Sequence, residues 1–259
     1  MTKRFTQIGF SQRVRLEWLE YTANQVLAGN PSEEIKKALQ KYLTDKLSVD
    51  NTPVRGNREK AITILMKVWV HPQKELRLFN KHGLHLISKS PQSWHLGLHW
   101  GMAMAAYPFW RVVAASVGRL LRLQGSASAA QVQQRIREQY GERETVFRAA
   151  RRILRSFHDW GVLVDTKVKG VYKQGKILTI KEPQVAAWIV EALLHATESG
   201  ADPLDSLLTA PSIFPFRLHR LSADQIASLS GRIEVVRHGL DESLLMLAKI
   251  PPKNWKTRG

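Results

Sequence analysis

The sequence predicts a mainly helical fold with a small amount of β-structure. Over most of the first 160 residues, apolar side chains recur at the i, i+3, i+4, i+7 spacing of an amphipathic helix. After Gly161 the pattern changes to short runs rich in Val, Ile and Tyr, which are typical of strands. We expect a helical N-terminal domain at residues 1–106, a domain of three helices and a small β-hairpin at 107–200, and a small α+β appendage at 201–259.

Five helices are expected before residue 107, after a loose basic lead-in over residues 1–10. Residues 29–31 separate the first two helices, Pro72 ends the third and Gly83 ends the fourth. Residues 50–57 are expected to form a loop. The fifth helix is apolar almost all round, which is typical of a buried helix. The expected helices are Ser11–Leu27, Ser32–Leu43, Arg58–Val70, Gln73–Lys81 and Trp94–Tyr107.

The stretch from Ser90 to Trp110 also has to be considered as a membrane span. It contains no Asp, Glu, Lys or Arg, and about 20 residues suffice to cross a bilayer. However, prolines and histidines interrupt it, whereas spanning helices are mostly continuous apolar runs. We therefore expect a buried helix and no membrane partner.

Three helices and a hairpin are expected between residues 107 and 180. Phe109–Leu123 is amphipathic, Ser128 can cap a helix over Ala129–Tyr140, and Gly161 can close a helix over Glu144–Trp160. Short β-prone runs follow, with a turn expected at Lys173-Gln174-Gly175. This order is that of a winged helix-turn-helix at about Tyr107–Ile180, in which the third helix enters the major groove and the hairpin tip contacts a phosphate backbone. The three β-prone runs are Val162–Val164, Val168–Tyr172 and Lys176–Ile180.

The helix at Glu144–Trp160 separates its apolar side chains from its arginines. The apolar face is predicted to be buried, and four arginines lie on the opposite side within a sector of roughly 100°. Like charges at such spacings repel by about 0.2–0.5 kcal/mol per pair, so the stripe favours a polyanion as its partner. The hairpin tip is expected to carry four lysines. The predicted DNA-binding residues lie at the start of this helix, along it and at the hairpin tip: Arg143, Arg148, Arg151, Arg152, Arg155, Lys167, Lys169, Lys173 and Lys176.

The remainder of the chain carries weaker patterns. Pro183–Glu198 is expected to be a helix, and 199–203 a linker. A helical turn at Leu204–Leu208, a capped helix at Ser222–Leu229 and two paired strands should follow, before a basic and mobile tail over 251–259. The two strands are expected at Arg232–Val236 and Leu244–Ala248.

The overall charge favours an acidic partner. The chain of 259 residues has 39 Lys and Arg against 22 Asp and Glu, which gives a formal charge of +17. Such a charge favours nucleic acid, an anionic membrane surface or an acidic protein. The sequence contains no cysteine, which excludes disulfides and thiolate chemistry and is consistent with a reducing cytoplasm. The first residues lack the apolar core of a signal peptide.

No pattern predicts catalysis, a metal or a cofactor. His95 and His99 have the spacing of two metal ligands, but Leu96 stands where a zinc protease needs Glu, so we expect core histidines bonded to backbone. His82 and His85 are expected in a loop. A P-loop, a dinucleotide fingerprint and a nucleophile elbow are all absent from the sequence. Most of the eight tryptophans are expected in the core rather than in a base-stacking platform. We expect a protein that is not an enzyme.

Five segments of the chain carry a family resemblance: Phe5-Thr6, a helix near Leu16, the helix start Ser32-Glu33-Glu34-Ile35, a basic helix around Arg58, and Asp159-Trp160-Gly161-Val162-Leu163. In these segments the chain resembles the BrxA family, small basic proteins of bacterial BREX phage-defence systems. The likeness covers about Phe5 to Ile180, and the segment after Gly200 is an addition to the family's usual length. The resemblance implies a non-enzymatic accessory of a defence complex that binds double-stranded DNA. Two alternatives stay open: an interaction scaffold whose basic face docks an acidic protein, and a site-specific transcription regulator.

Overall fold

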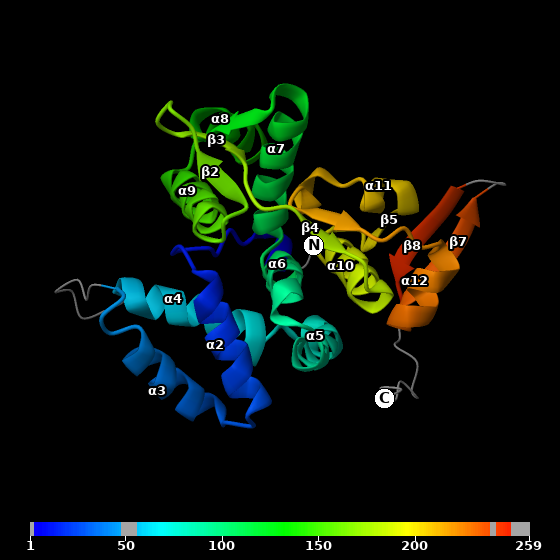
Figure 1. Cartoon of the computed structure of the whole chain (residues 1–259), viewed down its shortest axis with the longest axis horizontal. Helices are drawn as coiled ribbons and strands as arrows, with labels where there is room; N and C mark the ends of the chain where they lie inside the picture. The colour runs from blue at the N-terminus through cyan, green and yellow to red at the C-terminus, as the bar shows by residue number, and fades with distance from the viewer. Residues whose placement is uncertain (1–2, 48–55, 239–241, 250–259) are drawn as a thin grey trace.

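Helix α6 (His95–Ala106) is the centre around which the other helices pack. A computed structural model of the chain describes residues 3–47, 56–238 and 242–249. In it, all twelve residues of α6 are buried. Its neighbouring helices come from residues 16 to 195 (Figure 1). They include α2 (Leu16–Leu27), α5 (Arg77–Lys89), α7 (Pro108–Gln124) and α10 (Pro183–His195). The mainly helical fold class is confirmed.

Glycines bring the neighbouring helices close to α6. A Cβ atom added at Gly101 would lie 2.5 Å from the ring of Trp188, and one added at Gly83 would lie 2.7 Å from the same ring. Trp188 of α10 therefore fits between α5 and α6 only because both glycines lack side chains. The prediction that Gly83 ends a helix was wrong for this reason, since α5 continues through it to Lys89.

The N-terminal part is helical, largely as predicted. The lead-in forms a short helix rather than a loose chain, and α2 begins at Leu16 instead of Ser11. Leu27, the last residue of α2, is 40% exposed. The expected loop at 50–57 lies outside the described residues except for Gly56 and Asn57. The remaining elements are α1 (Lys3–Thr6), α3 (Ser32–Tyr42), α4 (Asn57–Leu65), a π-helical turn (Met66–Val70) and a 3-10 turn (Lys74–Leu76).

Helices α7, α8 and α9 lie at the predicted positions. Ser128 caps α8, as expected: its hydroxyl accepts the backbone N–H of Gln131, whose side chain accepts the N–H of Ser128. A three-stranded antiparallel sheet accompanies these helices, in the order β1-β3-β2. Strand β1, with Ala127 opposite Tyr172, was not predicted. The elements are β1 (Ser126–Ser128), α8 (Ala129–Tyr140), α9 (Glu144–Asp159), β2 (Leu163–Asp165) and β3 (Val171–Gln174).

The hairpin differs from the predicted one. It joins β2 to β3 through residues 166–170, where Gly170 has the left-handed φ of +77°. The predicted turn at Lys173-Gln174-Gly175 was wrong because Gly175 donates its N–H to the Val162 carbonyl and continues alongside that segment. A Cβ atom at Gly175 would lie 2.3 Å from the Gly161 carbonyl oxygen, so this glycine permits a close backbone approach.

The C-terminal part packs against α6, α7 and α10. Strand β4 (Leu178–Ile180) had been predicted to pair with β3. That prediction was wrong, because β4 pairs in parallel with β6 (Phe216–Leu218). The predicted linker is also wrong in part, since 201–203 forms strand β5 on the edge of a second antiparallel sheet. The expected pair of strands is confirmed, and the predicted tail at 251–259 lies outside the described residues. The other elements are β5 (Ala201–Pro203), α11 (Leu204–Leu208), a 3-10 turn (Pro211–Ile213), α12 (Ala223–Ser230), β7 (Ile233–His238) and β8 (Glu242–Leu247).

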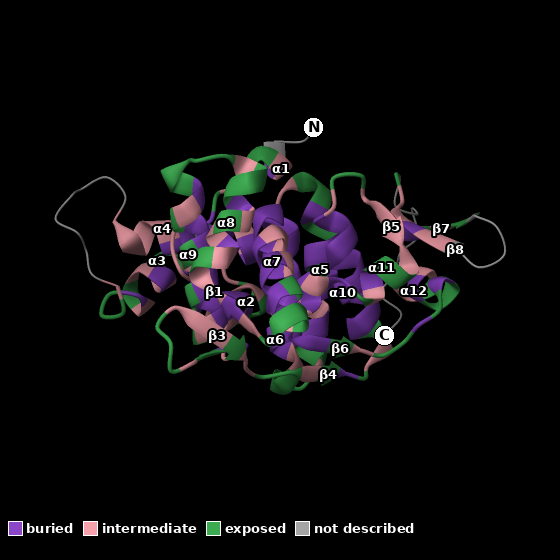
Figure 2. Ribbon diagram, turned by 90° about the horizontal axis from the view of Figure 1, so that it is seen from above, coloured by how far each residue is buried: buried purple, intermediate pink, exposed green. Residues whose placement is uncertain are grey.

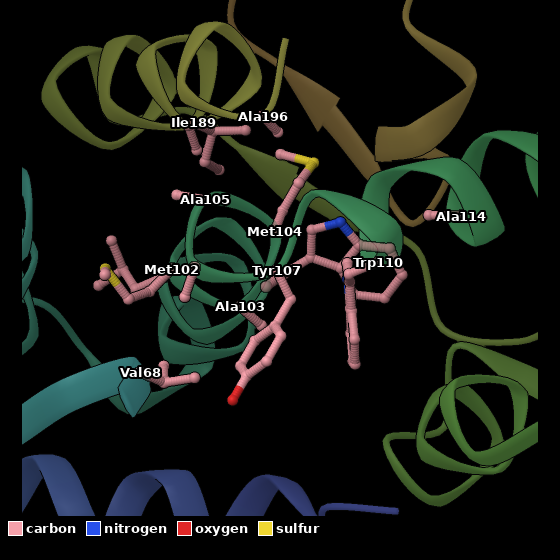
Figure 3. Close-up of a cluster of buried hydrophobic side chains, with 14 of the residues drawn as sticks. Val68, Met102, Ala103, Met104, Ala105, Tyr107, Trp110, Ala114, Ile189 and Ala196 are labelled. Carbon is pink, nitrogen blue, oxygen red and sulfur yellow. The ribbon is translucent and has the colours of Figure 1, made fainter. Parts of the chain in front are cut away.

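The core is aromatic where α6 passes into α7. Figure 2 shows buried residues concentrated in α6, α7 and α10, and Figure 3 shows Met104, Tyr107 and Trp110 at this junction. Five of the tryptophans are almost fully buried, so their predicted packing role is confirmed. In the part of the chain that the structure describes, no helix is both long and apolar enough to cross a membrane. The five are Trp18, Trp69, Trp100, Trp110 and Trp188.

The three predicted domains make many contacts with one another. Helix α6 of residues 1–106 contacts α10 of residues 107–200, and α7 packs closely on the 3-10 turn Pro211–Ile213. The boundaries at residues 106 and 200 therefore stay a prediction.

Candidate nucleic-acid interface

Helix α9 buries the predicted apolar face. Val146, Ala149, Ile153 and Phe157 are all buried. The Phe157 ring stacks on Trp100 with a centroid distance of 4.6 Å and meets Trp110 edge-on at 4.9 Å. Aromatic pairs in these arrangements stabilise beyond the area they bury. The helix is thereby fixed in rotation, with its arginines directed away from the core.

The arginines of α9 differ in exposure and in pairing. Arg148, Arg151 and Arg155 are exposed, and Arg152 is half-buried. Arg148 donates from Nε to a carboxylate oxygen of Glu144 at 2.8 Å. Within the described part of the chain, Arg151, Arg152 and Arg155 form neither an ion pair nor a side-chain hydrogen bond. We call these three residues the free arginines of α9.

Among the arginines of α9, Arg152 has surroundings that disfavour its positive charge. Partial burial and the neighbouring Arg148 guanidinium lower the pKa of Arg152 below its usual value. A guanidinium stays protonated in proteins despite such shifts. A bound anion would relieve this repulsion, so the geometry of α9 favours an anionic partner.

Arg143 lies in the turn between α8 and α9. It is exposed, and its Nε donates to the Tyr140 carbonyl at 3.3 Å. Tyr140 packs edge-on against Phe109 of α7, with a centroid distance of 5.3 Å. Gly141, with a φ of +74°, lets the chain leave α8. Arg143 therefore stands beside the N-terminus of α9 on a turn that is anchored to the core.

Two of the four predicted lysines are at the hairpin tip. Lys167 and Lys169 are exposed within the loop 166–170. The Thr166 hydroxyl shapes this loop, because it donates to the Val168 carbonyl and accepts the Val168 N–H, both at 3.1 Å. The tip thus presents two cations on an ordered turn.

The other two lysines are elsewhere. Lys173 lies in β3 opposite Val164, and Lys176 follows that strand with its N–H bonded to the Gly161 carbonyl. Because side chains alternate along a strand, Lys173 is on the sheet face opposite to Tyr172. Both lysines are exposed. Their predicted place at the tip was wrong, because it depended on the incorrect turn at 173–175.

Two contacts hold the hairpin in place relative to the helices. The Gly170 carbonyl accepts the N–H of Ala129, the first residue of α8, at 2.8 Å. At the other end, His158 of α9 lies 3.0 Å from the carboxylate of Asp165 in β2. The 166–170 hairpin is therefore fixed relative to α8 and α9, and Figure 1 shows α9 beside β2 and β3.

The N-terminal segment holds the far end of α9. The Val14 N–H donates to the Ser156 hydroxyl at 3.0 Å, and the Trp160 indole N–H donates to the Val14 carbonyl at 2.9 Å. Arg13 lies 3.5 Å from Asp159. Ser156 and Trp160 are buried, so this contact leaves the free arginines uncovered. Sequence reasoning missed it, because nothing local to residues 11–15 indicates a partner 140 residues away.

His95 and His99 bind a carboxylate rather than backbone alone. Glu20 of α2 accepts from His95 Nδ1 at 2.9 Å and from His99 Nε2 at 2.8 Å. The Trp69 indole N–H donates to His99 Nδ1 at 3.1 Å, which requires a neutral His99. The hydrogen bond to Glu20 raises the pKa of His95, whereas burial lowers that of His99. The expectation of backbone partners was therefore wrong for His99 and incomplete for His95, which also approaches the Ser90 carbonyl.

A second buried group, the Glu191 cluster, joins α5 and α10 to the end of α12 and the residue before β7. It consists of Glu191, Arg232, Ser230, His82 and His195. The Glu191 carboxylate accepts two hydrogen bonds from Arg232, each at 2.7 Å, and one from Ser230 at 2.8 Å. Arg232 also lies 3.0 Å from His82 Nδ1, so His82 is a buried helix residue and not the predicted loop residue. Among the described residues, no group of three or more His, Cys, Asp or Glu could hold a metal ion.

A cleft with a volume of about 560 Å³ adjoins α7, and sequence reasoning missed it. Arg111, Arg119 and Arg122 line it. Their spacings of eight and eleven residues put them on one face of a helix, which is a signal the sequence contains. The sequence prediction for this segment considered only its apolar residues.

No protein-family model matches the chain, and neither a curated protein nor a solved structure matches it. The resemblance to the BrxA family thus has only the residues quoted above in its favour. The free arginines of α9 and the hairpin lysines are the basis on which a function can be assigned.

Proposed function

We propose that this protein binds duplex DNA through a winged helix-turn-helix, with α9 in the major groove and the 166–170 loop on the neighbouring phosphate backbone. The order α7, α8, α9 and the β2–β3 hairpin supports this fold assignment. The single observation that carries the proposal is that the three free arginines of α9 have no counter-charge among the residues at 3–47, 56–238 and 242–249.

The shape and charge of the surface both suit a duplex. An α-helix with its side chains is about 10–12 Å across, and the major groove is about 12 Å wide. Each cation that neutralises a phosphate releases a condensed counterion, which favours binding at low salt. The free arginines, Arg143 and the tip lysines supply such cations on one surface, and the formal charge of +17 attracts DNA from a distance.

Most of these contacts would go to phosphates, with little reading of sequence. A bidentate arginine can recognise guanine, but three neighbouring arginines on one helix would require several guanines at adjacent positions. No Asn or Gln lies on α9 to pair with adenine. Ser156 is also unavailable, because it is buried and bonded to the N-terminal segment. Thr145 is the remaining neutral polar side chain on the exposed surface of α9.

The test is duplex binding as a function of salt. We expect the affinity for a random-sequence duplex to fall steeply between about 50 and 200 mM salt, with a log–log slope of about −0.9 per contacted phosphate. The double variant Arg151→Ala/Arg155→Ala should bind more weakly and show a shallower slope, by roughly two contacts. Arg77→Ala is the matched control, because Arg77 is exposed on α5, far from the hairpin (Figure 1).

The outcome separates the alternatives. Affinity that does not change with salt, or an equal loss in the Arg77→Ala control, would contradict the proposal. Weak DNA binding together with tight binding of an acidic protein would favour the interaction scaffold.

A second comparison concerns sequence preference. Arg151→Ala and Arg152→Ala should weaken binding to random and selected duplexes of equal length by the same factor, since phosphate contacts position the protein without reading bases. A uniform loss fits an accessory of a phage-defence complex, the role that the BrxA resemblance implies. A loss confined to one sequence would instead identify a site-specific regulator.

A further inference from the structure

The cleft beside α7 has walls from two separate parts of the chain. One wall is α7 with its three arginines, and Gln139 of α8 lies at the edge. The other wall is the segment 202–212, which contributes polar side chains and a stretch of backbone. From that segment, the polar lining residues are Asp202, Ser206, Thr209 and Ser212.

The walls are held by close contacts beneath the cleft. A Cβ atom at Gly118 of α7 would lie 2.0 Å from the Pro211 carbonyl oxygen, so the helix and the 211–213 turn touch through their backbones. The Trp100 indole N–H donates to the Ser212 carbonyl at 3.2 Å. The cleft is thus a fixed feature of the fold rather than a space between loose loops.

The cleft has more positively charged than negatively charged side chains. Arg111 lies 3.8 Å from Asp202, and its Nε is buried without a hydrogen-bond partner. Burial lowers the pKa of Arg111, and Arg119 adds to that effect although Asp202 opposes it. Arg122 donates to the Ala210 carbonyl at 3.5 Å, and Arg119 has no ion pair within the described residues. Three arginines therefore face one carboxylate.

The charge is distributed unevenly along the cleft. Arg119 and Arg122 are one turn apart and exposed, so two guanidinium groups can converge on one anion. Arg111 lies roughly 12 Å away along the helix axis, given a rise of about 1.5 Å per residue. One end of the cleft therefore offers two guanidinium groups, and the other offers Arg111 with the carboxylate acceptor of Asp202.

We propose that this cleft binds a small phosphorylated polyol, such as a sugar phosphate. The phosphate lies between Arg119 and Arg122, whose planar guanidinium groups match phosphate oxygens in bidentate geometry. Hydroxyl groups of the ligand donate to Asp202 at the opposite end. Among the described residues, none of those that line the cleft is aromatic, so they offer no surface on which a nucleobase would stack. The volume of about 560 Å³ is within the range of small-molecule sites.

Calorimetric titration of the full chain with ribose 5-phosphate tests this assignment, with ribose and inorganic phosphate as comparison ligands. We expect ribose 5-phosphate to bind at least about tenfold more tightly than phosphate, and ribose not to bind. The variant Arg119→Gln/Arg122→Gln should lose at least about tenfold in affinity for ribose 5-phosphate. The matched control is Arg151→Gln/Arg155→Gln, which removes two exposed arginines outside the cleft and should leave this affinity unchanged.

Asp202→Ala distinguishes the two ends of the cleft. It should weaken the binding of ribose 5-phosphate while leaving that of inorganic phosphate unchanged or tighter, because a negative charge is removed. No binding of ribose 5-phosphate to the parent protein would overturn the proposal. Equal losses in the cleft and α9 variants would also overturn it, since the anion would then be held by surface charge in general. If the double cleft variant does not fold, the single variant Arg119→Gln gives the same comparison at an exposed position.

Discussion

The arginines of α9 and the arginine of the Glu191 cluster have the same chemistry in opposite surroundings. Arg232 is buried, and its guanidinium donates two hydrogen bonds to Glu191. The free arginines of α9 have no such partner among the described residues, and two of them are exposed. Burying an unpaired charge costs several kcal/mol, whereas water solvates a charge at the surface. Charge that is paired and buried in this molecule therefore serves stability, and charge that is unpaired and exposed is available to a ligand.

Breaking the buried pair should have the largest effect. Glu191→Gln keeps the size of the side chain but leaves the Arg232 charge buried without its carboxylate, so the free energy of unfolding should fall by about 3–5 kcal/mol. Urea unfolding measures the change. The control is Glu144→Gln, which removes the exposed pair with Arg148 and should change the same quantity by less than about 1 kcal/mol. Equal effects at the two sites would contradict the distinction drawn between them.

Acidification should weaken the buried cluster by a smaller amount. Burial and the Arg232 guanidinium lower the pKa of His82 from its ordinary 6.5 to about 4. The unfolded chain therefore takes up the proton first, and stability falls as the pH decreases from 6.5 towards 4. The contribution of His82 should be about 2 kcal/mol between pH 7 and pH 5.

The variant His82→Gln isolates this contribution. Its unfolding free energy should depend less on pH over that interval than that of the parent protein. Burial lowers the pKa of His99 as well, and His99 stays in both proteins, so the difference between the two curves belongs to His82. Parallel curves would contradict this prediction, because they would show that His82 takes up its proton over the same pH range in the folded and the unfolded chain.

The smallest effect on stability is expected on the exposed face of α9. Arg155→Ala should change the free energy of unfolding by no more than about 0.5 kcal/mol, because its side chain packs against nothing in the core. Phe157→Ala, two residues along the same helix, should destabilise by about 3–5 kcal/mol, because Phe157 is fully buried. Thermal unfolding of the two variants makes the comparison. Similar melting temperatures would mean that α9 is rotated relative to the orientation described here.

The parts of the fold that depend on neighbouring residues were predictable from the sequence. Helix α8 begins directly after Ser128, and helix α9 ends just before Gly161. Both ends were predictable because caps act within one turn. Gly175 and Gly170 look equivalent in the sequence, yet one permits a close approach to Gly161 and the other provides a left-handed turn. Deciding which glycine forms the hairpin turn requires knowledge of how β2 pairs with β3, and that pairing is a contact between strands.

The candidate site also has residues that local patterns predict and others that depend on distant parts of the chain. The arginines of α9 follow from helical periodicity, and Lys167 and Lys169 are at the tip of the hairpin even though the predicted turn was misplaced. The cleft could not be predicted in full, because its second wall comes from residues 202–212, which begin 78 residues after the end of α7 at Gln124. The His82 contact with Arg232 spans 150 residues and leaves no local trace in the sequence.

The contact between Val14 and α9 has a consequence for synthesis on the ribosome. The Trp160 indole bonds to a residue 146 positions earlier in the chain. At a translation rate of about 5–20 residues per second, Val14 leaves the ribosome roughly 7–30 s before Trp160 does. During that interval the apolar side chains of the first helices have no α9 to cover them. The nascent N-terminal segment must therefore wait, exposed or held by a chaperone, until the helix that carries the free arginines has been completed.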